Sequence, residues 1–149
     1  MGCEKLEKGG GVKGGTGNVA GAARQGAAVG REFNMLSGED ATALGFMAHG
    51  GTGCISVTSN VAPRLCADFQ TASLAGDYKT ALALQDRLMP LHDALFCEAN
   101  PGPVKYAASR LGLCETETRL PLAPISDASK KIVDAALASV GLVSAAAAE

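Results

Sequence analysis

The sequence has no tryptophan, and aromatic residues make up only 4% of its 149 residues. Platforms on which nucleic-acid bases could stack are therefore scarce. Basic residues are not in excess either, because 13 lysines and arginines stand against 15 acidic residues and the formal net charge is −2. The sequence has no basic stripe of the kind that binds phosphate backbones. These shortages argue against a nucleic-acid partner.

The cysteines and histidines also lack the spacings that are typical of metal sites and disulfide frameworks. The cysteines are scattered, without a C-x-x-C pair or a histidine at zinc spacing, at Cys3, Cys54, Cys66, Cys97 and Cys114. An odd, unclustered set is typical of free thiols in a reducing compartment. The N-terminus has no apolar signal core, and no run reaches the roughly 18 apolar residues of a membrane span. We therefore expect a cytoplasmic protein with no metal and no membrane contact.

The first half of the chain alternates strand-like and helix-like segments. Hydrophobic residues make up 47% of the sequence and charged residues 19%, which is typical of a globular chain. Strands are expected in a short segment ending at Lys13 and at residues 33–36 and 54–58, and helices at residues 18–29, at residues 40–49 and after Asn60. This alternation is typical of parallel βα units.

Polar residues and glycines mark the ends of these expected helices. Asn18 can cap the first helix and Gly30 can end it. Residues 37–40 could bind a ligand at a strand end, or Ser37 or Asp40 could cap the second helix, and for Asp40 we favour capping. Pro63 falls near the first turn of the third helix, where proline is tolerated.

After Gly76 the pattern predicts helices alone. One helix has an apolar face formed by Leu84, Leu88, Leu91 and Leu95, and Pro90 inside it should cause a kink. A short helix is expected at residues 104–111. A last helix, capped by Ser126 or Asp127, has an apolar face of Ile132, Val133, Ala136, Leu137 and Val140. The predicted organisation is a βα region at residues 1–76 and a helical domain at residues 77–149.

Lys13 is the first candidate for chemistry, because it ends the first expected strand. In barrels of βα units the carboxyl ends of the strands hold the active site. A lysine there forms a Schiff base with a carbonyl substrate when its amine is neutral. The competing interpretation is a solvated lysine in a glycine-rich loop, and spacing alone favours that interpretation. His49 and His92 are isolated on helical segments and are expected to be surface or core histidines.

A nucleotide site competes for the same segment. Gly15, Gly17 and Ala20 follow the G-x-G-x-x-A pattern between an expected strand and an expected helix. Glu39 and Asp40 stand roughly where a ribose-binding acid would come. The pattern is weak by itself, and the remainder of a two-halved nucleotide sheet is missing.

Several ordered motifs resemble the dihydrodipicolinate synthase family of pyruvate-dependent Schiff-base aldolases, in the C-terminal half of its members. The motifs are residues 11–17 (GVKGGTG), 36–44 (LSGEDATAL), 53–63 (GCISVTSNVAP), 87–92 (RLMPLH), 100–106 (NPGPVKY) and 120–125 (LPLAPI). The resemblance covers roughly residues 11–142. It implies a partial TIM (β/α)8 barrel, with about three C-terminal βα units, followed by a C-terminal helical extension.

The resemblance also implies site residues. Lys13 takes the position of the family's imine-forming lysine, Gly38 leaves room beside the imine, and Ile55 meets pyruvate through its backbone. The sequence departs from the family where Gly14 replaces the usual acid after the lysine and where Gly15 follows. The proton-relay tyrosines and threonine of the family belong to an N-terminal half that has no counterpart in these 149 residues.

The implied reaction is that of a 4-hydroxy-tetrahydrodipicolinate synthase in lysine and diaminopimelate biosynthesis. Pyruvate would condense with aspartate semialdehyde through the imine on Lys13, with no metal or organic cofactor. Full-length members are commonly homotetramers, and we expect a fragment of this kind to have little activity alone. Two alternatives stay open: a nucleotide-binding fragment, and a non-catalytic piece that docks on barrel subunits.

Overall fold

The structure, a computed structural model, describes residues 10–30 and 32–144, so Cys3 and the other residues of the N-terminal segment lie outside the described part. The chain divides into two compact units. The first contains the residues up to Ser56 together with Asp68–Leu82, and the second contains Val57–Ala67 together with the residues from Ala83 onward. The proposed boundary between residues 76 and 77 stays a prediction.

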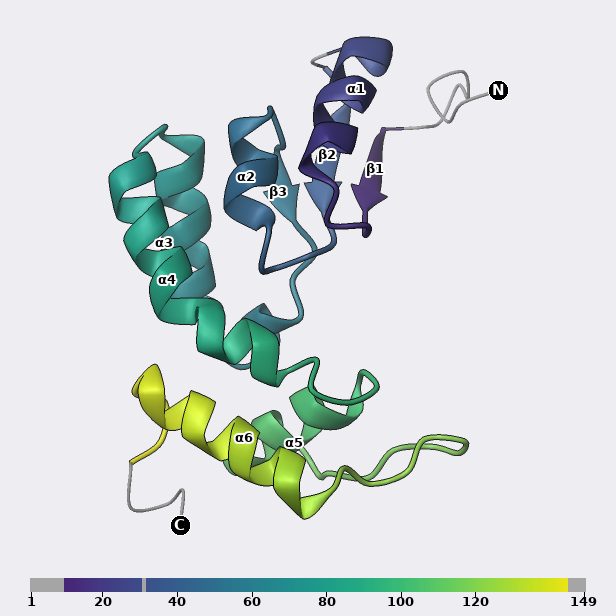
Figure 1. Ribbon diagram of the computed structural model, residues 1–149, viewed down its shortest axis with the longest axis vertical. Coiled ribbons are helices and arrows are strands. Elements are labelled where there is room, and N and C mark those ends of the chain that lie inside the picture. The colour runs from purple at the N-terminus through teal and green to yellow at the C-terminus, as the bar shows by residue number, and fades with distance from the viewer. Residues whose placement is uncertain (1–9, 31, 145–149) are drawn as a thin grey trace. The chain divides into compact units, whose positions relative to one another are not determined.

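The first unit contains a three-stranded parallel sheet (Figure 1). Its strands are β1 (Gly11–Gly14), β2 (Asn34–Ser37) and β3 (Gly53–Cys54), in the order β1-β2-β3. In the register of the sheet Lys13 lies opposite Leu36, and Leu36 lies opposite Gly53. The α/β class and the parallel pairing are as the sequence predicts.

The third strand is shorter than the predicted residues 54–58. Its pairing with β2 stops after Ile55, whose N–H donates to the Ser37 carbonyl at 2.8 Å. Because β2 ends at Ser37, residues beyond Ile55 have no strand beside them in this sheet. The chain instead forms the 3-10 helix η2 (Thr58–Asn60).

Helices α1 (Val19–Val29) and α2 (Ala43–Ala48) cover one face of the sheet (Figure 1). Their contact with it is a small apolar cluster of Ala22, Met35 and Phe46, against which Val12 and Phe33 pack. The predicted caps of α1 are confirmed: the Asn18 side chain accepts a hydrogen bond from the Gly21 N–H, and Gly30 has a φ of 87°.

The predicted start of the second helix is wrong. α2 begins at Ala43, its N-cap is Thr42, and no side chain caps it. Ser37 and Asp40 therefore do not cap this helix. Two local turns delay the helix, because Ser37 bonds to the backbone of Glu39 and the Asp40 carbonyl accepts from the Ala43 N–H.

Two longer helices follow along the chain. α3 (Pro63–Leu74) begins at its proline, and α4 (Tyr78–Ala94) includes Pro90. A turn with a positive φ of 74° at Gly76 separates them, which favours glycine there. Within the described residues, no helix has both the length and the apolar composition needed to cross a membrane.

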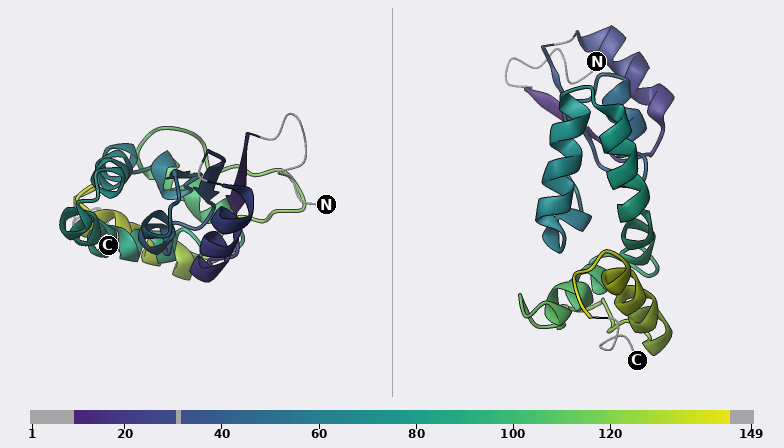
Figure 2. Two further views of the ribbon diagram at one scale, coloured as in Figure 1. Left: turned by 90° about the horizontal axis from the view of Figure 1, so that it is seen from above. Right: turned by 90° about the vertical axis from the view of Figure 1, so that its left-hand side faces the viewer.

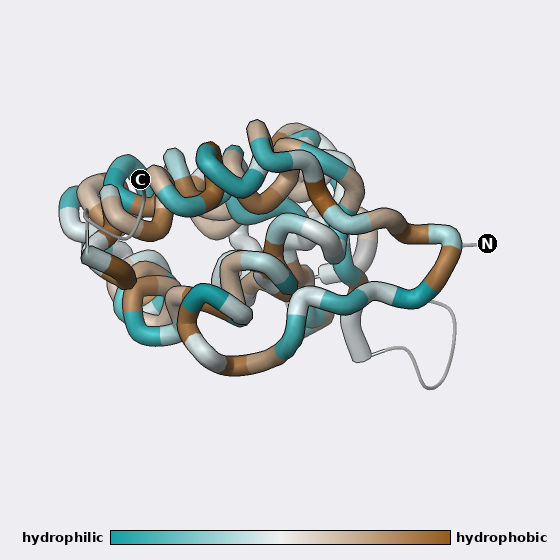
Figure 3. Tube along the Cα trace, turned by 90° about the horizontal axis from the view of Figure 1, so that it is seen from below, coloured by the Kyte–Doolittle hydropathy of each residue, from teal (hydrophilic) through white to brown (hydrophobic). Residues whose placement is uncertain are grey.

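The second unit includes α5 (Gly102–Arg110) and α6 (Asp127–Ser139), which lie side by side (Figure 2). Ser126 caps α6 by accepting from the Ser129 N–H at 3.2 Å, as predicted. The buried residues that anchor this unit include Leu88 and Leu91 of α4 and Leu95, which directly follows that helix. Hydrophobic and hydrophilic residues alternate along the helical segments, as expected when a helix buries one face (Figure 3).

One residue of the predicted apolar face of α6 is misassigned. Val133, Ala136, Leu137 and Val140 are buried, whereas Ile132 is 50% exposed. Successive residues of a helix point about 100° apart, so Ile132 cannot share the direction of Val133. The buried face instead follows the spacing of Val133 and Leu137.

Candidate functional site

The three residues that the sequence singles out lie at one edge of the sheet. Lys13 is the third residue of β1, Gly38 directly follows β2, and Ile55 directly follows β3. Because the strands are parallel, their carboxyl ends meet at the same edge. The sheet thus brings together residues that are separated by more than forty positions along the chain.

Backbone hydrogen bonds hold these strand ends together. The Gly38 N–H donates to the Gly14 carbonyl at 2.7 Å, which ties the end of β2 to the end of β1. The Ile55 N–H donates to the Ser37 carbonyl at 2.8 Å, which ties β3 to β2. Since the N–H of Ile55 is used within the fold, the backbone group of Ile55 that can meet a ligand is its carbonyl oxygen.

Gly38 lies directly beside the lysine side chain. A Cβ atom built on Gly38 would lie 2.5 Å from Cε of Lys13, and 3.1 Å from both the Gly14 carbonyl oxygen and the Gly15 Cα. Contacts below 3.0 Å are incompatible with van der Waals radii, so a side chain here would displace the lysine stem. Glycine at this position therefore leaves the space that the end of Lys13 occupies.

A cavity of about 160 Å³ lies beside Lys13 in the same unit. Its polar lining comes from Thr16, Asn18, Gln25, Ser37 and Thr42. This volume suits a molecule of a few heavy atoms better than a dinucleotide. Short polar side chains of this kind can donate and accept hydrogen bonds without adding charge.

The glycine that follows the lysine lies close to the Phe46 ring. A Cβ atom on Gly14 would lie 3.3 Å from the Phe46 ring, and one on Gly51 would lie 2.4 Å from it. Phe46 itself is only 6% exposed and belongs to the apolar cluster between the sheet and helices α1 and α2. Gly14, where the resembling family has an acid, thus borders a packed aromatic ring.

The glycine loop that competes as a nucleotide site is organised around the start of α1. Gly17 has a φ of 66°, and Asn18 already accepts the N–H of Gly21 through its side chain. Glu39, the proposed ribose-binding acid, accepts from the Ala41 N–H at 3.4 Å. The side chains of Asn18 and Glu39 therefore both form hydrogen bonds within the fold.

The predicted role of the histidines as structural residues agrees with their contacts. His92 is 5% exposed, and its Nδ1 lies 2.7 Å from the hydroxyl of Thr58, which is fully buried. His49 is exposed, and its Nδ1 lies 2.8 Å from the Gly45 carbonyl. Among residues 10–30 and 32–144, no group of three or more histidines, cysteines and acids is arranged to hold a metal ion.

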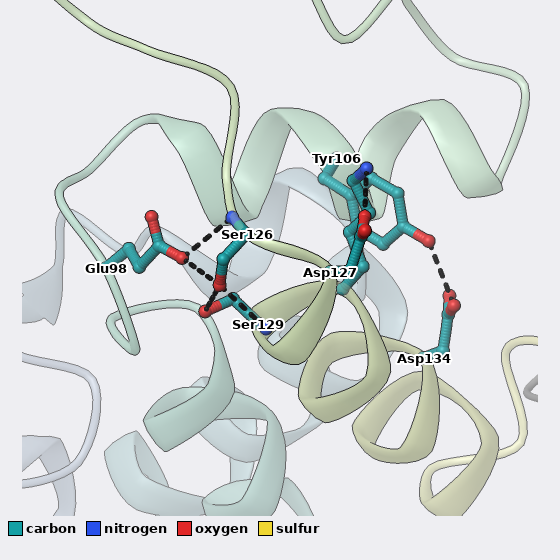
Figure 4. Close-up of polar contacts among 7 residues, drawn as sticks. Glu98, Tyr106, Ser126, Asp127, Ser129 and Asp134 are labelled. Atoms are coloured by element: carbon teal, nitrogen blue, oxygen red, sulfur yellow. Dashed lines mark hydrogen bonds and ion pairs between the residues drawn. The ribbon is translucent and has the colours of Figure 1, made fainter.

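The second unit holds a polar network that the sequence does not reveal (Figure 4). The hydroxyl of Tyr106 donates to Oδ2 of Asp134 at 2.9 Å, and Nε of Arg110 lies 2.8 Å from Oδ1 of the same carboxylate. Burial raises the pKa of Tyr106, and the hydrogen bond to Asp134 raises it further. This network joins α5 to α6.

Glu98 bonds to a residue 28 positions away along the chain. Its Oε1 accepts from the backbone N–H of Ser126 at 2.9 Å and from the Ser126 hydroxyl at 2.7 Å (Figure 4). The hydroxyl of Ser129 lowers the pKa of Glu98 most, and the two groups of Ser126 lower it further. Glu98 thus fixes the segment at which α6 begins.

Comparisons with known proteins point to one family. The sequence model of the Dihydrodipicolinate synthetase family matches residues 3–140. A 4-hydroxy-tetrahydrodipicolinate synthase from Parvibaculum lavamentivorans is 62% identical over 133 residues, which cover 89% of this chain and 46% of the relative. The enzyme of that name from Afipia carboxidovorans is 60% identical over 133 residues, covering 89% and 45%.

A solved structure has the same backbone arrangement. The chloride-inhibited dihydrodipicolinate synthase from Acinetobacter baumannii, complexed with pyruvate, superposes with a TM-score of 0.90 at 34% sequence identity. The match covers 94% of this chain and 48% of that one. This chain spans about half the length of the relatives it matches.

Proposed function

Because this chain belongs to the dihydrodipicolinate synthetase family, we propose that Lys13 forms an imine with pyruvate at the strand edge described above. The observation that carries the proposal is the position of the lysine: its Cε lies against Gly38, beside a small polar cavity at the carboxyl edge of a parallel sheet. The relative solved with pyruvate supports the choice of this keto acid.

The proposed step balances as a condensation. Neutral Nζ of Lys13 attacks the ketone carbon of pyruvate, and the carbinolamine loses its oxygen as water to give the protonated imine. Loss of a proton from the methyl group then gives an enamine. The enamine carbon forms a bond to the aldehyde carbon of aspartate semialdehyde, whose oxygen takes up a proton and becomes the hydroxyl. The amino nitrogen of the semialdehyde then attacks the imine carbon, and the bond from that carbon to Nζ breaks, which gives cyclic 4-hydroxy-tetrahydrodipicolinate and the free lysine.

We assign Gly38 and Ile55 supporting roles in this step. Gly38 leaves the room in which the end of Lys13 and a bound keto acid can lie side by side. The carbonyl oxygen of Ile55, at the end of β3, offers an acceptor at the same edge, because its N–H is already bonded to Ser37.

The proposed architecture is three βα units of a (β/α)8 barrel followed by a helical extension. The described part contributes three parallel strands, and the relatives are about twice as long. Proton transfer around the imine needs groups besides Lys13, and residues that act as a unit fail together. We therefore expect these 149 residues to form the imine but to complete few turnovers.

The test is reductive trapping with pyruvate and borohydride, read from the mass of the intact chain. A single pyruvyl adduct is expected in the original chain and its loss in Lys13→Arg, which keeps the charge and removes the nucleophile. Circular dichroism of both samples ensures that folded proteins are compared. A folded chain that forms no adduct but binds a dinucleotide saturably would support the nucleotide alternative instead.

A further inference from the structure

Ser37, the last residue of β2, has a side chain that the proposed chemistry leaves unused. It is 1% exposed, so its hydroxyl is out of contact with solvent. The hydroxyl donates to the Glu39 carbonyl at 3.0 Å and accepts from the Glu39 N–H at 3.2 Å. Both bonds reach across Gly38, so the side chain of Ser37 closes a tight turn around that glycine.

The turn is connected to both neighbouring strands. The Gly38 N–H donates to the Gly14 carbonyl at 2.7 Å, and the Ser37 carbonyl accepts from the Ile55 N–H at 2.8 Å. Within this turn a Cβ atom on Gly38 would lie only 2.5 Å from Cε of Lys13. The Ser37 turn is therefore the place where the ends of all three strands meet.

A buried serine hydroxyl is stabilising only when it has hydrogen-bond partners. Burying a hydroxyl without partners costs more than burying an alanine methyl group in the same space. The partners of Ser37 lie in the turn itself and not in the apolar cluster of α1 and α2. Its hydrogen bonds therefore stabilise the shape of the turn.

We propose that Ser37 is a positioning residue for Lys13. By closing the turn, it holds Gly38 against the lysine stem and so fixes the position of the lysine side chain at the strand edge. This inference rests on the proposed imine chemistry for its function, but its structural claim can be tested without pyruvate.

The test compares Ser37→Ala with a matched control, Ser73→Ala. Ser73 is a buried serine of the same unit, 5% exposed, whose hydroxyl donates to the Phe69 carbonyl within α3 at 2.8 Å. Each substitution removes one buried hydroxyl that bonds to the backbone, and only Ser37 lies at the strand edge. Losses of global stability should therefore be similar in the two variants.

The pyruvate-independent readout is nuclear magnetic resonance on the whole chain. The original chain and Ser73→Ala should show a nuclear Overhauser effect between the Lys13 ε protons and the Gly38 α protons. Ser37→Ala should lose it, and hydrogen exchange of the Gly38 amide should rise about fivefold, the factor that corresponds to one hydrogen bond of typical net strength. An unchanged contact and an unchanged exchange rate in Ser37→Ala would overturn the proposal.

The second readout is the pyruvate dependence of the trapping rate. Ser37→Ala should lower the rate at saturating pyruvate about fivefold and change the half-saturating concentration less, because orientation and not binding is lost. Ser73→Ala should alter neither. If the original chain traps no pyruvate, the proposed function fails while the resonance readout still decides the role of Ser37.

If Ser37→Ala does not fold, a second variant, Ser37→Cys, tests the same proposal. Ser37→Cys keeps almost the same side-chain shape and replaces the hydroxyl with a weaker donor. It should change the Gly38 exchange rate in the same direction by a smaller factor. A Ser37→Cys chain with the exchange rate of the original would contradict the proposal.

Discussion

The first unit, which contains the strands (the strand unit), and the second unit (the helical unit) are stabilised by different interactions. Of the ten largest side chains that are fully buried in the described part, only Met35 and Ser37 belong to the strand-containing unit. The helical unit buries large aliphatic side chains such as Leu88 and Leu137. The strand ends instead depend on backbone hydrogen bonds and on glycines that make room.

Because of this difference, the helical unit has the larger buried core and the strand unit leaves Lys13 accessible. The helical unit is stabilised by its own side chains, and its polar network joins one helix to another. In the described part of the chain, Lys13 and Asn34 are exposed on the face of the sheet away from α1 and α2, and Ile55, directly after β3, is 49% exposed. A reactive lysine needs such openness, and the same openness leaves the sheet with little core.

The largest expected effect is in the helical unit. Leu137→Ala removes a side chain with no exposed surface and should lower the free energy of unfolding by about 3 kcal/mol. Ile132→Ala, on the exposed side of the same helix, should change it by less than about 0.5 kcal/mol. Urea denaturation measures both. Equal losses would contradict the assignment of the buried face of α6.

The next effect is in the strand unit and concerns chemistry more than stability. Gly38→Ala puts a Cβ where Cε of Lys13 lies and should slow pyruvate trapping about tenfold or more, because the lysine must move. Gly10→Ala is the control, since a Cβ there meets no atom within 4 Å. If both variants trap pyruvate at the original rate, the space at Gly38 has no role.

A smaller effect is expected from Tyr106→Phe. The substitution removes the hydroxyl that donates to Asp134 and should lower the free energy of unfolding by about 1 kcal/mol. Tyr78→Phe, at a tyrosine that is 45% exposed, should cost less than about 0.5 kcal/mol. Urea titrations at neutral pH compare the pair, and a Tyr78→Phe loss as large as that of Tyr106→Phe would contradict the role of the network.

The raised pKa of Tyr106 also predicts a pH dependence. The folded state favours the protonated phenol, so this contribution to stability is complete below the unfolded pKa of about 10 and is lost as pH rises through the folded pKa. Tyr106→Phe should therefore be less sensitive to alkaline pH than the original chain. Unfolding free energies measured between pH 8 and pH 11, roughly the range around a tyrosine pKa, test this difference.

The smallest effect is expected at Glu98, which is partly exposed to solvent. Its pKa is lowered by the Ser129 hydroxyl and by Ser126, so its contribution is complete above the unfolded pKa of 4.5 and is lost as pH falls through the folded pKa. Glu98→Gln should weaken the loss of stability on acidification. Glu115→Gln, in the exposed segment before α6, is the control, and an identical acid response in both variants would contradict the contact with Ser126.

Local signals in the sequence predicted the local structure well. Asn18 and Gly30 identified both ends of α1, and Ser126 identified the start of α6, because capping depends on residues within one turn. Of the predicted apolar face, Leu88 and Leu91 are buried within α4 and Leu95 is buried directly after it, whereas Leu84 is only partly buried. The resemblance to a family indicated Lys13, Gly38 and Ile55, whose shared strand edge the structure then revealed.

Contacts between distant segments escaped prediction. The bonds of Glu98 to Ser126 and of Tyr106 to Asp134 join residues 28 positions apart, and no local pattern marks them. The end of β3 was missed because β-branched residues favour a strand only where a neighbouring strand continues. The close approach of Gly38 to Lys13 likewise depends on sheet register, which the sequence does not display.

The central claim is that Lys13, and no other lysine, forms the imine. The most direct measurement is peptide-level mass spectrometry of the chain after trapping with pyruvate and borohydride, with the exposed Lys79 of α4 as an internal reference. The account predicts that the pyruvyl group is found on the peptide that contains Lys13 and that Lys79 stays unmodified. An adduct spread equally over both lysines, or found on Lys79 alone, would contradict it.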